Sequence, residues 1–360
     1  MKIESISLSR INTYKDCEWK HFLQYILRFS EPPKKKTECG TIVHHVLEIL
    51  GMSKKTGHYK LKDKYSDPKY LLDIVFKRFQ KNMPNLGLEQ SDYKFCENSI
   101  EKVLNSQFNP LKLNIIDVEA EFEYSLGMKG FSTEGGEQCK IKGVIDVISR
   151  VDKDTIEIID YKTGQRKDWV TGKLKTLEDF EKDLQLRIYN LASINMFPKY
   201  TNRLYTVIFI NDGGPFTVTF DIEDVDITID VLRRHFNEIK DNNNPVRLKD
   251  DSSRQSQHWK CRKICAFGGK LASFINETTG DIVKQKFGSS EKIPDEILID
   301  SEKYLLYNDY NGLSLCDLSY SLYRKNQHES LQQLSIDQKI LNGKSRSSTF
   351  TSNAHKGTIC

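Results

Sequence analysis

An acid and a base stand two residues apart near the end of one strongly apolar segment, "TIEIIDYKTG" at residues 155–164. Its β-branched residues predict a buried strand, in which every second side chain points to the same face. Asp160 and Lys162 therefore share a face with Ile156 and Ile158. A lone pair of this kind is more commonly a structural ion pair at a sheet edge, so its surroundings decide its meaning.

A second aspartate is predicted to lie opposite the first. The preceding segment, "KIKGVIDVISRV", also alternates with period two, and the intervening "VDKD" suits a tight turn. A hairpin centred on Lys153 places Asp146 directly opposite Asp160, with Cβ atoms roughly 4.5–5.5 Å apart. Two ionised carboxylates at that distance repel, so either one carries a proton or a cation lies between them. A divalent ion such as Mg²⁺ is the economical solution.

Lys162 completes an arrangement suited to the hydrolysis of a phosphodiester. Its ammonium group, one pleat beyond Asp160, can reach a water molecule or a phosphate oxygen beside the same ion. There it can orient an attacking water and offset negative charge that builds at phosphorus. On this interpretation the aspartates bind the metal, and the lysine acts on water and phosphate.

The hairpin is preceded by helical patterns and followed by mixed ones. The periodicity predicts helices over 7–29, 40–50, within 66–85 and 90–108, and over 177–194 and 225–240, with strands over 114–127, 140–151, 155–164, 203–210 and 216–220. Residues 241–257 are typical of a polar linker, 258–267 form a short cysteine-bearing segment, and 270–340 show no clear pattern. The Ser/Thr/Lys-rich end, 344–360, is expected to be disordered.

Composition excludes few partners. The 360 residues are 38% hydrophobic and 29% charged with a net charge of +4, so any nucleic-acid surface must be a local patch. No run approaches the roughly 18 apolar residues of a membrane span. The charged start predicts a cytoplasmic protein, in a host cytoplasm if the source is viral. Eight scattered cysteines are then core thiols or metal ligands rather than a disulfide framework.

The segment "GVIDVISRVDKDTIEIIDYKTG" resembles the core of the PD-(D/E)xK nuclease superfamily, in particular its RecB-like branch, which includes CRISPR-adaptation nucleases and helicase–nuclease subunits. "GTIVHHVLE" resembles the N-terminal helix motif of that family, which makes His44 a metal ligand on the helix face of Glu48. By itself, His44 could also be a helix histidine capped by Glu48. "QLRIY" resembles the Q-x-x-x-Y motif, whose residues, here Gln185 and Tyr189, hold the DNA backbone or order the catalytic helix.

The opening helix, "SLSRINTYKDCEWKHFLQYI", resembles one whose cysteine is often the first ligand of an iron–sulfur cluster. Cys17 matches that position, and "WKCRKICAF" supplies Cys261 and Cys265. The chain departs from the family pattern because the pair is spaced C-x3-C and no third cysteine follows closely; Cys316 is the next candidate and is distant in sequence. Four thiolates are normally required. Buried free thiols, or a site that has lost its metal, are the alternatives to a 4Fe–4S cluster.

The resemblance implies a restriction-endonuclease-like α/β fold, a mixed sheet flanked by helices. The nuclease domain would span 1–268 with a helical insertion at about 50–110, followed by an uncertain region, 269–343, and the disordered tail, 344–360. It also implies a metal-dependent deoxyribonuclease, most consistent with an exonuclease that acts on DNA ends or single strands in recombination, repair or replication, with a helicase or recombination partner.

Under this resemblance, Mg²⁺ or Mn²⁺ would be bound by His44, Asp146, Asp160 and the Tyr161 carbonyl, and Lys162, Gln185 and Tyr189 would complete the catalytic set. The basic residues that follow the strand are candidates for DNA contact: Arg166, Lys167, Lys173 and Lys175. Two other functions stay open. One is an inactive nuclease-fold protein that binds DNA or serves in assembly, and the other is a sequence-specific endonuclease, which needs an element that reads bases.

Overall fold

The computed structural model describes residues 3–61, 64–126, 138–168, 171–287, 291–299, 301–326, 328–330 and 332–334. The chain forms two compact units, and each is treated by itself. The first unit comprises Met1–Ile11 and Pro33–Asn243, and the second comprises Asn12–Pro32 and Asn244–Cys360. The predicted disordered tail, 344–360, lies outside the described residues.

The first unit is built on a mixed six-stranded sheet. Its strands are β1 (Ser5–Ile6), β2 (Ile115–Ser125), β3 (Lys140–Arg150), β4 (Thr155–Lys162), β5 (Asn202–Phe209) and β6 (Gly213–Val218). Strand β3 pairs antiparallel with β2 and β4 and parallel with β1, whereas β4 pairs parallel with β5, and β5 antiparallel with β6. Together with its flanking helices, this sheet confirms the predicted α/β fold.

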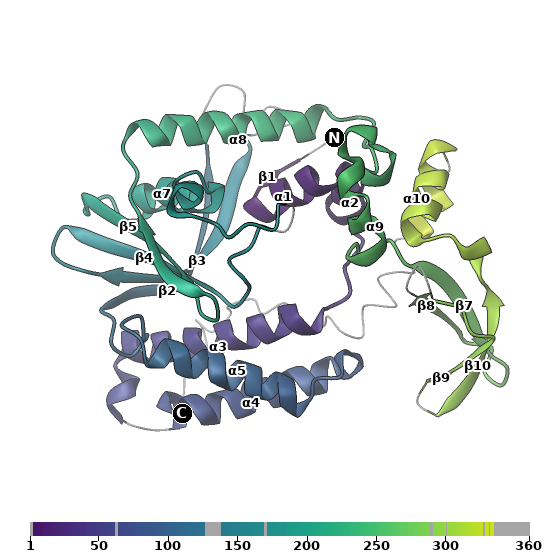
Figure 1. Cartoon of the computed structure of the whole chain (residues 1–360), viewed down its shortest axis with the longest axis horizontal. Helices are drawn as coiled ribbons and strands as arrows, with labels where there is room; N and C mark the ends of the chain where they lie inside the picture. Colours follow the sequence, from purple (N-terminus) through teal and green to yellow (C-terminus); the bar gives the residue numbers. More distant parts are fainter. Residues whose placement is uncertain are drawn as a thin grey trace. The chain divides into compact units, whose positions relative to one another are not determined.

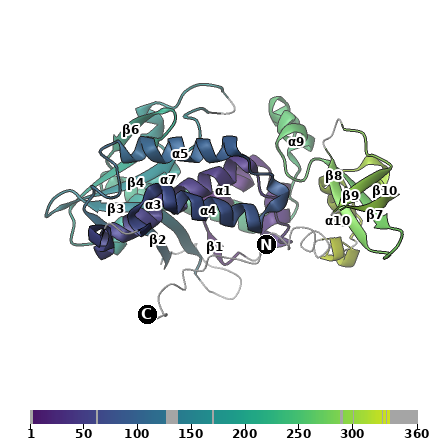
Figure 2. The ribbon, with the colours of Figure 1, turned by 90° about the horizontal axis from the view of Figure 1, so that it is seen from below.

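Helices cover both faces of this sheet (Figure 1). On one side lie α3 (Lys35–Thr56), α4 (Pro68–Asn82) and α5 (Gln90–Leu104), which pack against one another (Figure 2). On the other side lie α7 (Leu184–Met196) and α8 (Glu223–Asp241), and the short α6 (Leu177–Glu181) precedes α7. Short 3₁₀ turns accompany the first group at His58–Leu61, Lys64–Ser66 and Pro84–Leu86.

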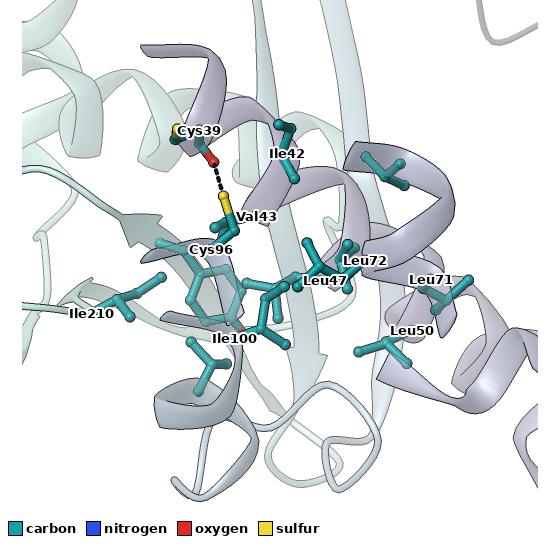
Figure 3. Packing of buried hydrophobic residues seen from close by; sticks show 14 of the residues in the cluster. Cys39, Ile42, Val43, Leu47, Leu50, Leu71, Leu72, Cys96, Ile100 and Ile210 are labelled. Carbon is teal, nitrogen blue, oxygen red and sulfur yellow. Dashed lines mark hydrogen bonds between the residues drawn. The ribbon is translucent and has the colours of Figure 1, made fainter. Parts of the chain in front are cut away.

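The main apolar core lies between α3, α4, α5 and the sheet (Figure 3). From the sheet it takes Val147, Ile159 and Tyr161, which point away from the face that carries Asp160. Cys39 and Cys96 belong to this core as free thiols, and Cys96 donates a hydrogen bond from Sγ to the Cys39 carbonyl at 3.6 Å. Burial raises the pKa of both thiols, so they are poor nucleophiles and act as packing residues.

The β3–β4 hairpin has the predicted register. Val147 pairs with Ile159 and Ile148 with Ile158, and the ladder ends there. Asp146 and Asp160 are the next residues on the two strands, at the point where the strands part. The end of the ladder therefore leaves room beside the two carboxylates.

Two predicted helices are interrupted by capping residues. The segment 7–29 divides into α1 (Leu8–Asp16), α2 (Glu18–His21) and a π-helical turn, Phe22–Ile26, because Cys17 adopts an extended conformation and its sulfur accepts the N–H of Lys20 at 3.4 Å. The segment 177–194 divides between α6 and α7, where the carboxylate of Asp183 caps α7 by accepting the Gln185 N–H. The second break fixes the start of the helix that carries Gln185 and Tyr189.

The second unit adds a small antiparallel sheet in the order β8–β7–β10–β9 (Figure 2). Its later elements are α9 (Trp259–Lys263), β7 (Lys270–Asn276), β8 (Ile282–Phe287), β9 (Glu296–Ile299), β10 (Glu302–Asn308), a 3₁₀ turn at Tyr310–Gly312 and α10 (Leu315–Arg324). The interpretation of 241–257 as a polar linker is wrong for its later part, where Leu248 is buried and 3₁₀ turns occupy Leu248–Asp250 and Ser252–Gln257. Among the described helices, none is both long and apolar enough to cross a membrane.

Candidate active site

A cavity of about 470 Å³ opens in the first unit where β3 and β4 part. Asp146 on β3, Asp160 and Lys162 on β4, His44 on α3, and Gln185 and Tyr189 on α7 all line it. These are the residues that the sequence predicted for metal binding and catalysis, and the fold brings their side chains to one place.

Asp160 is the most enclosed of these groups, with 2% of its side chain exposed. Its Oδ1 accepts hydrogen bonds from Lys162 Nζ at 3.0 Å and Gln185 Nε2 at 2.9 Å, and Tyr189 Oη lies at 3.4 Å. Its Oδ2 is buried 2.7 Å from Lys162 Nζ and accepts no hydrogen bond from the part of the chain that the structure describes. One carboxylate oxygen is thus fixed, and the other keeps lone pairs for a ligand.

Helix α7 holds the lysine in place. Lys162 Nζ donates to Gln185 Oε1 at 3.0 Å, Gln185 Nε2 donates to Tyr189 Oη at 2.7 Å, and Tyr189 Oη donates to the Val144 carbonyl at 2.9 Å. Gln185 and Tyr189 lie one helical turn apart, so both face the strands. Burial alone would lower the pKa of Lys162, but the carboxylates of Asp160 and Asp146 outweigh burial and hold that pKa above its usual value. The ammonium therefore stays charged at neutral pH.

Asp146 connects the two strands to α3. Its Oδ2 accepts the backbone N–H of Tyr161 at 2.9 Å and lies 3.5 Å from His44 Nδ1. Burial, with the nearby Asp160 carboxylate, raises the pKa of Asp146 to about 6, although His44, Lys162 and the Tyr161 N–H act in the opposite direction. The site thus holds more negative charge than its own residues stabilise.

Glu119 is a further member of the site that the sequence did not reveal. Oxygens of Glu119 and Asp146 and a nitrogen of His44 lie within 4.8 Å of one another, close enough to share a metal ion. In the β2–β3 ladder Glu119 lies between Val118 and Ala120, which pair with Val147 and Ile145, and this register sets it opposite Asp146. Its φ of 44° is unusual within a strand. Burial and the nearby carboxylates raise the pKa of Glu119 to about 8.

Helix α3 presents His44 through a close approach to the loop after β4. A Cβ atom on Gly40 would lie 2.7 Å from Thr163 Oγ1, so glycine permits this approach. His45 points elsewhere, and its Nδ1 lies 3.1 Å from Glu48 Oε2. Glu48, predicted to share a face with His44, therefore pairs with the neighbouring histidine.

The four predicted DNA-contact residues lie in the β4–α6 connection, outside the residues that line the cavity. The Arg166 guanidinium lies over the Phe216 ring, 4.8 Å from its centroid, and Lys175 Nζ lies 3.4 Å from Asp183. Lys167 forms a backbone bridge with Leu174, and Lys173 is exposed. Lys142 on β3, which the sequence pattern did not single out, does line the cavity and is exposed.

The donor set fits a hard divalent cation. Carboxylate oxygens from Asp146, Asp160 and Glu119 are ligands that Mg²⁺ and Mn²⁺ prefer, and one imidazole, His44, is compatible with them. Burial and the neighbouring carboxylates raise the pKa of both Asp146 and Glu119, as expected where acidic ligands converge.

Residues 5–268 match the family model of the PD-(D/E)XK nuclease superfamily. The chain belongs to this superfamily. The match begins in β1 and ends after α9, and it contains the whole hairpin with Asp146, Asp160 and Lys162.

Curated relatives support the RecB-like branch. The chain is 26% identical over 188 residues to a subunit of the ATP-dependent helicase/deoxyribonuclease of Clostridioides difficile, and the match covers 46% of this chain and 16% of the relative. With the corresponding subunit from Streptococcus uberis it shares 23% identity over 164 residues, or 45% of this chain and 14% of the relative. The matched part thus spans less than a fifth of these relatives.

One solved structure, a candidate exonuclease from Eubacterium rectale, aligns with a TM-score of 0.42 and 13% identity. The alignment covers 70% of this chain and 87% of that chain.

The raised pKa values predict that metal binding competes with protons. Carboxyl groups whose pKa is raised in the folded state stabilise it when protonated, and this contribution is lost as pH rises from about 4 to the folded values of about 6 and about 8. The metal-free protein should therefore lose stability over that window. Mg²⁺ should raise the melting temperature more near pH 8 than near pH 6, with affinity rising about tenfold for each pH unit in which one proton is displaced.

Thermal melts with and without Mg²⁺ at the two pH values measure this effect. Glu119→Gln, which cannot titrate, is the matched variant and should show a smaller pH dependence of the Mg²⁺ shift. An equal Mg²⁺ shift at both pH values would contradict the prediction.

Proposed function

We propose that this protein is a divalent-metal-dependent deoxyribonuclease, and specifically an exonuclease. The observation that carries the proposal is the convergence of Asp146, Asp160 and Lys162 in one cavity, within a chain of the PD-(D/E)XK superfamily. Relatives named as deoxyribonuclease subunits support DNA as the substrate. The helicase in the names of these relatives supports a helicase partner. We extend the proposal to recombination, repair or replication of DNA in the cytoplasm.

His44, Glu119 and Asp146 would hold the ion, with Asp160 and the Tyr161 carbonyl as further candidate ligands. When bound, Mg²⁺ or Mn²⁺ would polarise the scissile phosphate and favour ionisation of the attacking water. Asp160 Oδ1 and Gln185 Oε1 fix the ammonium of Lys162 in the cavity. That ammonium then orients the water and balances negative charge that develops on the phosphate.

The remaining polar residues position the substrate. Gln185 and Tyr189 hydrogen-bond to each other, and through Asp160 and the Val144 carbonyl they join α7 to β4 and β3. Lys142 and the exposed Lys167 and Lys173 supply positive charge for the DNA backbone. Such contacts are nearly independent of sequence, which suits an exonuclease, and they weaken as the salt concentration rises.

The proposed cofactors include a 4Fe–4S cluster in the second unit, with Cys17, Cys261 and Cys265 among its ligands. The three thiols are free and belong to the same unit. Their chemistry fits, because thiolates are the usual ligands of such clusters. The cluster would be structural, since none of the described residues that line the cavity belongs to the second unit.

The test compares two forms of one DNA sequence, linear and covalently closed circular, incubated with the purified full chain and Mg²⁺ or Mn²⁺. We expect the linear form to be degraded to small products, the closed circle to persist and EDTA to stop the reaction. Discrete fragments from the closed circle would instead show a sequence-specific endonuclease. Equal binding of DNA with and without EDTA, and no cleavage, would show an inactive binding protein.

A further inference from the structure

A fourth cysteine lies beside the three predicted cluster ligands. The backbone N–H of Cys316, at the start of α10, donates to the Phe267 carbonyl at 2.9 Å, two residues after Cys265. Cys17 lies at the start of α2, where its sulfur accepts the N–H groups of Lys20 at 3.4 Å and Leu248 at 3.3 Å. Three segments remote in sequence therefore meet in the second unit.

The C-x3-C segment is held in a tight turn. The Cys265 N–H donates to the Lys260 carbonyl at 2.8 Å, and the Gly268 N–H donates to the Cys265 carbonyl at 3.1 Å. A Cβ atom on Gly268 would lie 1.8 Å from the Cys261 carbonyl oxygen, so the turn closes over Cys261 only with glycine. This turn fixes Cys261 and Cys265 close to Phe267, whose carbonyl accepts the hydrogen bond from Cys316.

The four thiols also interact electrostatically. Cys316 interacts with Cys265 and Cys17. Cys261 interacts with the same two thiols. These interactions place the four cysteines in one group.

The spacing favours a cluster over a single zinc ion. Four thiolates around zinc, each about 2.3 Å from the metal, lie within roughly 4 Å of one another. Among the residues that the structure describes, no three cysteine sulfurs lie within 4.8 Å of one another. A 4Fe–4S cluster binds one thiolate at each of four separate irons and so accepts a wider spacing than one zinc ion does.

We propose that Cys316 is the fourth ligand of the 4Fe–4S cluster, completing the set with Cys17, Cys261 and Cys265. This inference rests on the cluster put forward under the proposed function. Cys316 would take the place of the closely spaced third cysteine that the chain lacks after Cys265. Cys316 lies beyond the family match, which ends at residue 268. The cluster would therefore fasten the region from β7 to α10 to the helical segments of Cys17 and Cys261. A second backbone hydrogen bond, from Leu271 N–H to the Leu313 carbonyl at 3.0 Å, also joins the start of β7 to the segment before α10.

The test is the iron and acid-labile sulfide content of the full chain, purified without oxygen and reconstituted with iron and sulfide. The wild type should hold about four irons per chain with the broad visible absorption of a thiolate-bound cluster. Cys316→Ser should lose at least one iron in four and change the electron paramagnetic resonance of the oxidised protein. Cys139→Ser, which removes a buried free thiol of the first unit, is the matched control and should keep all four.

A measurement on the unaltered chain covers the case in which Cys316→Ser does not fold. Thiol alkylation followed by peptide mass spectrometry should modify Cys316 only after the cluster is removed, together with Cys17, Cys261 and Cys265. Retention of four irons by folded Cys316→Ser, alkylation of Cys316 in the loaded protein, or zinc in place of iron would overturn the inference. DNA cleavage by the same samples is scored separately, so loss of this inference leaves the nuclease proposal standing, and the reverse also holds.

Discussion

Asp160→Asn is expected to lower the rate of DNA cleavage by about a thousandfold or more while the protein stays folded. Asparagine is nearly isosteric with aspartate and can still accept hydrogen bonds at Oδ1 from Lys162 and Gln185. What is lost is the negative charge and the second acceptor oxygen, the buried Oδ2. Metal affinity and the placement of Lys162 both depend on that charge, because Lys162 Nζ lies 2.7 Å from Oδ2.

Single-turnover cleavage of end-labelled linear DNA in Mn²⁺ measures the effect, with circular dichroism and a thermal melt on the same samples. Asp230→Asn is the matched control, since the Asp230 side chain is 70% exposed and pairs with Arg233 on the same helix. It makes the same change of charge in the same unit and should cleave at the wild-type rate. Cleavage by Asp160→Asn within tenfold of wild type would remove Asp160 from the mechanism.

The placement of the two aspartates could be predicted because it depends on local structure. A four-residue connection between two alternating segments leaves few registers, and only one buries both apolar faces. The observed pairs, Val147 with Ile159 and Ile148 with Ile158, follow that register. The common orientation of Gln185 and Tyr189 could be predicted for a similar reason, because residues one helical turn apart share a face of the helix.

Glu119 could not be found in this way. Residues 126–139 separate β2 from β3, and a connection of that length does not fix which residues pair. The signal that marks Glu119, its φ of 44° opposite Asp146, exists only after the strands have paired. The sequence marks Cys316 as a candidate ligand but not as a neighbour of Cys265. That proximity depends on the backbone hydrogen bond from Cys316 to Phe267, which joins segments remote in sequence.

The sequence also does not predict which side chains the charged residues contact. Arg166 and Lys175 looked like free positive charges near the active strand, yet Arg166 lies over Phe216 and Lys175 beside Asp183. The sequence pattern does not distinguish Lys142 from the other polar residues of its strand, yet Lys142 lines the cavity. Local charge in a sequence therefore does not show which lysines line the cavity.

Lys162→Met is expected to lower kcat by about a hundredfold to a thousandfold with a smaller change in KM. Methionine keeps much of the apolar stem but removes the ammonium that contacts Asp160 and Gln185 Oε1. Because the pKa of Lys162 lies above its usual value, the group acts as a fixed cation and not as a base. The acid limb of the wild-type pH–rate profile should then follow the carboxyl groups, and it should move to higher pH in the variant because Lys162 lowers the pKa of Asp146.

Lys153→Met, at a position 90% exposed in the hairpin turn, is the matched control and should leave kcat unchanged. The double variant Asp160→Asn with Lys162→Met tests whether the two residues act as one unit. If they do, the double variant should be little slower than the worse single variant, as residues of one catalytic group are strongly non-additive. Fully multiplicative losses, or an acid limb that stays in place when Lys162 is replaced, would instead show that Lys162 acts independently of the carboxylates.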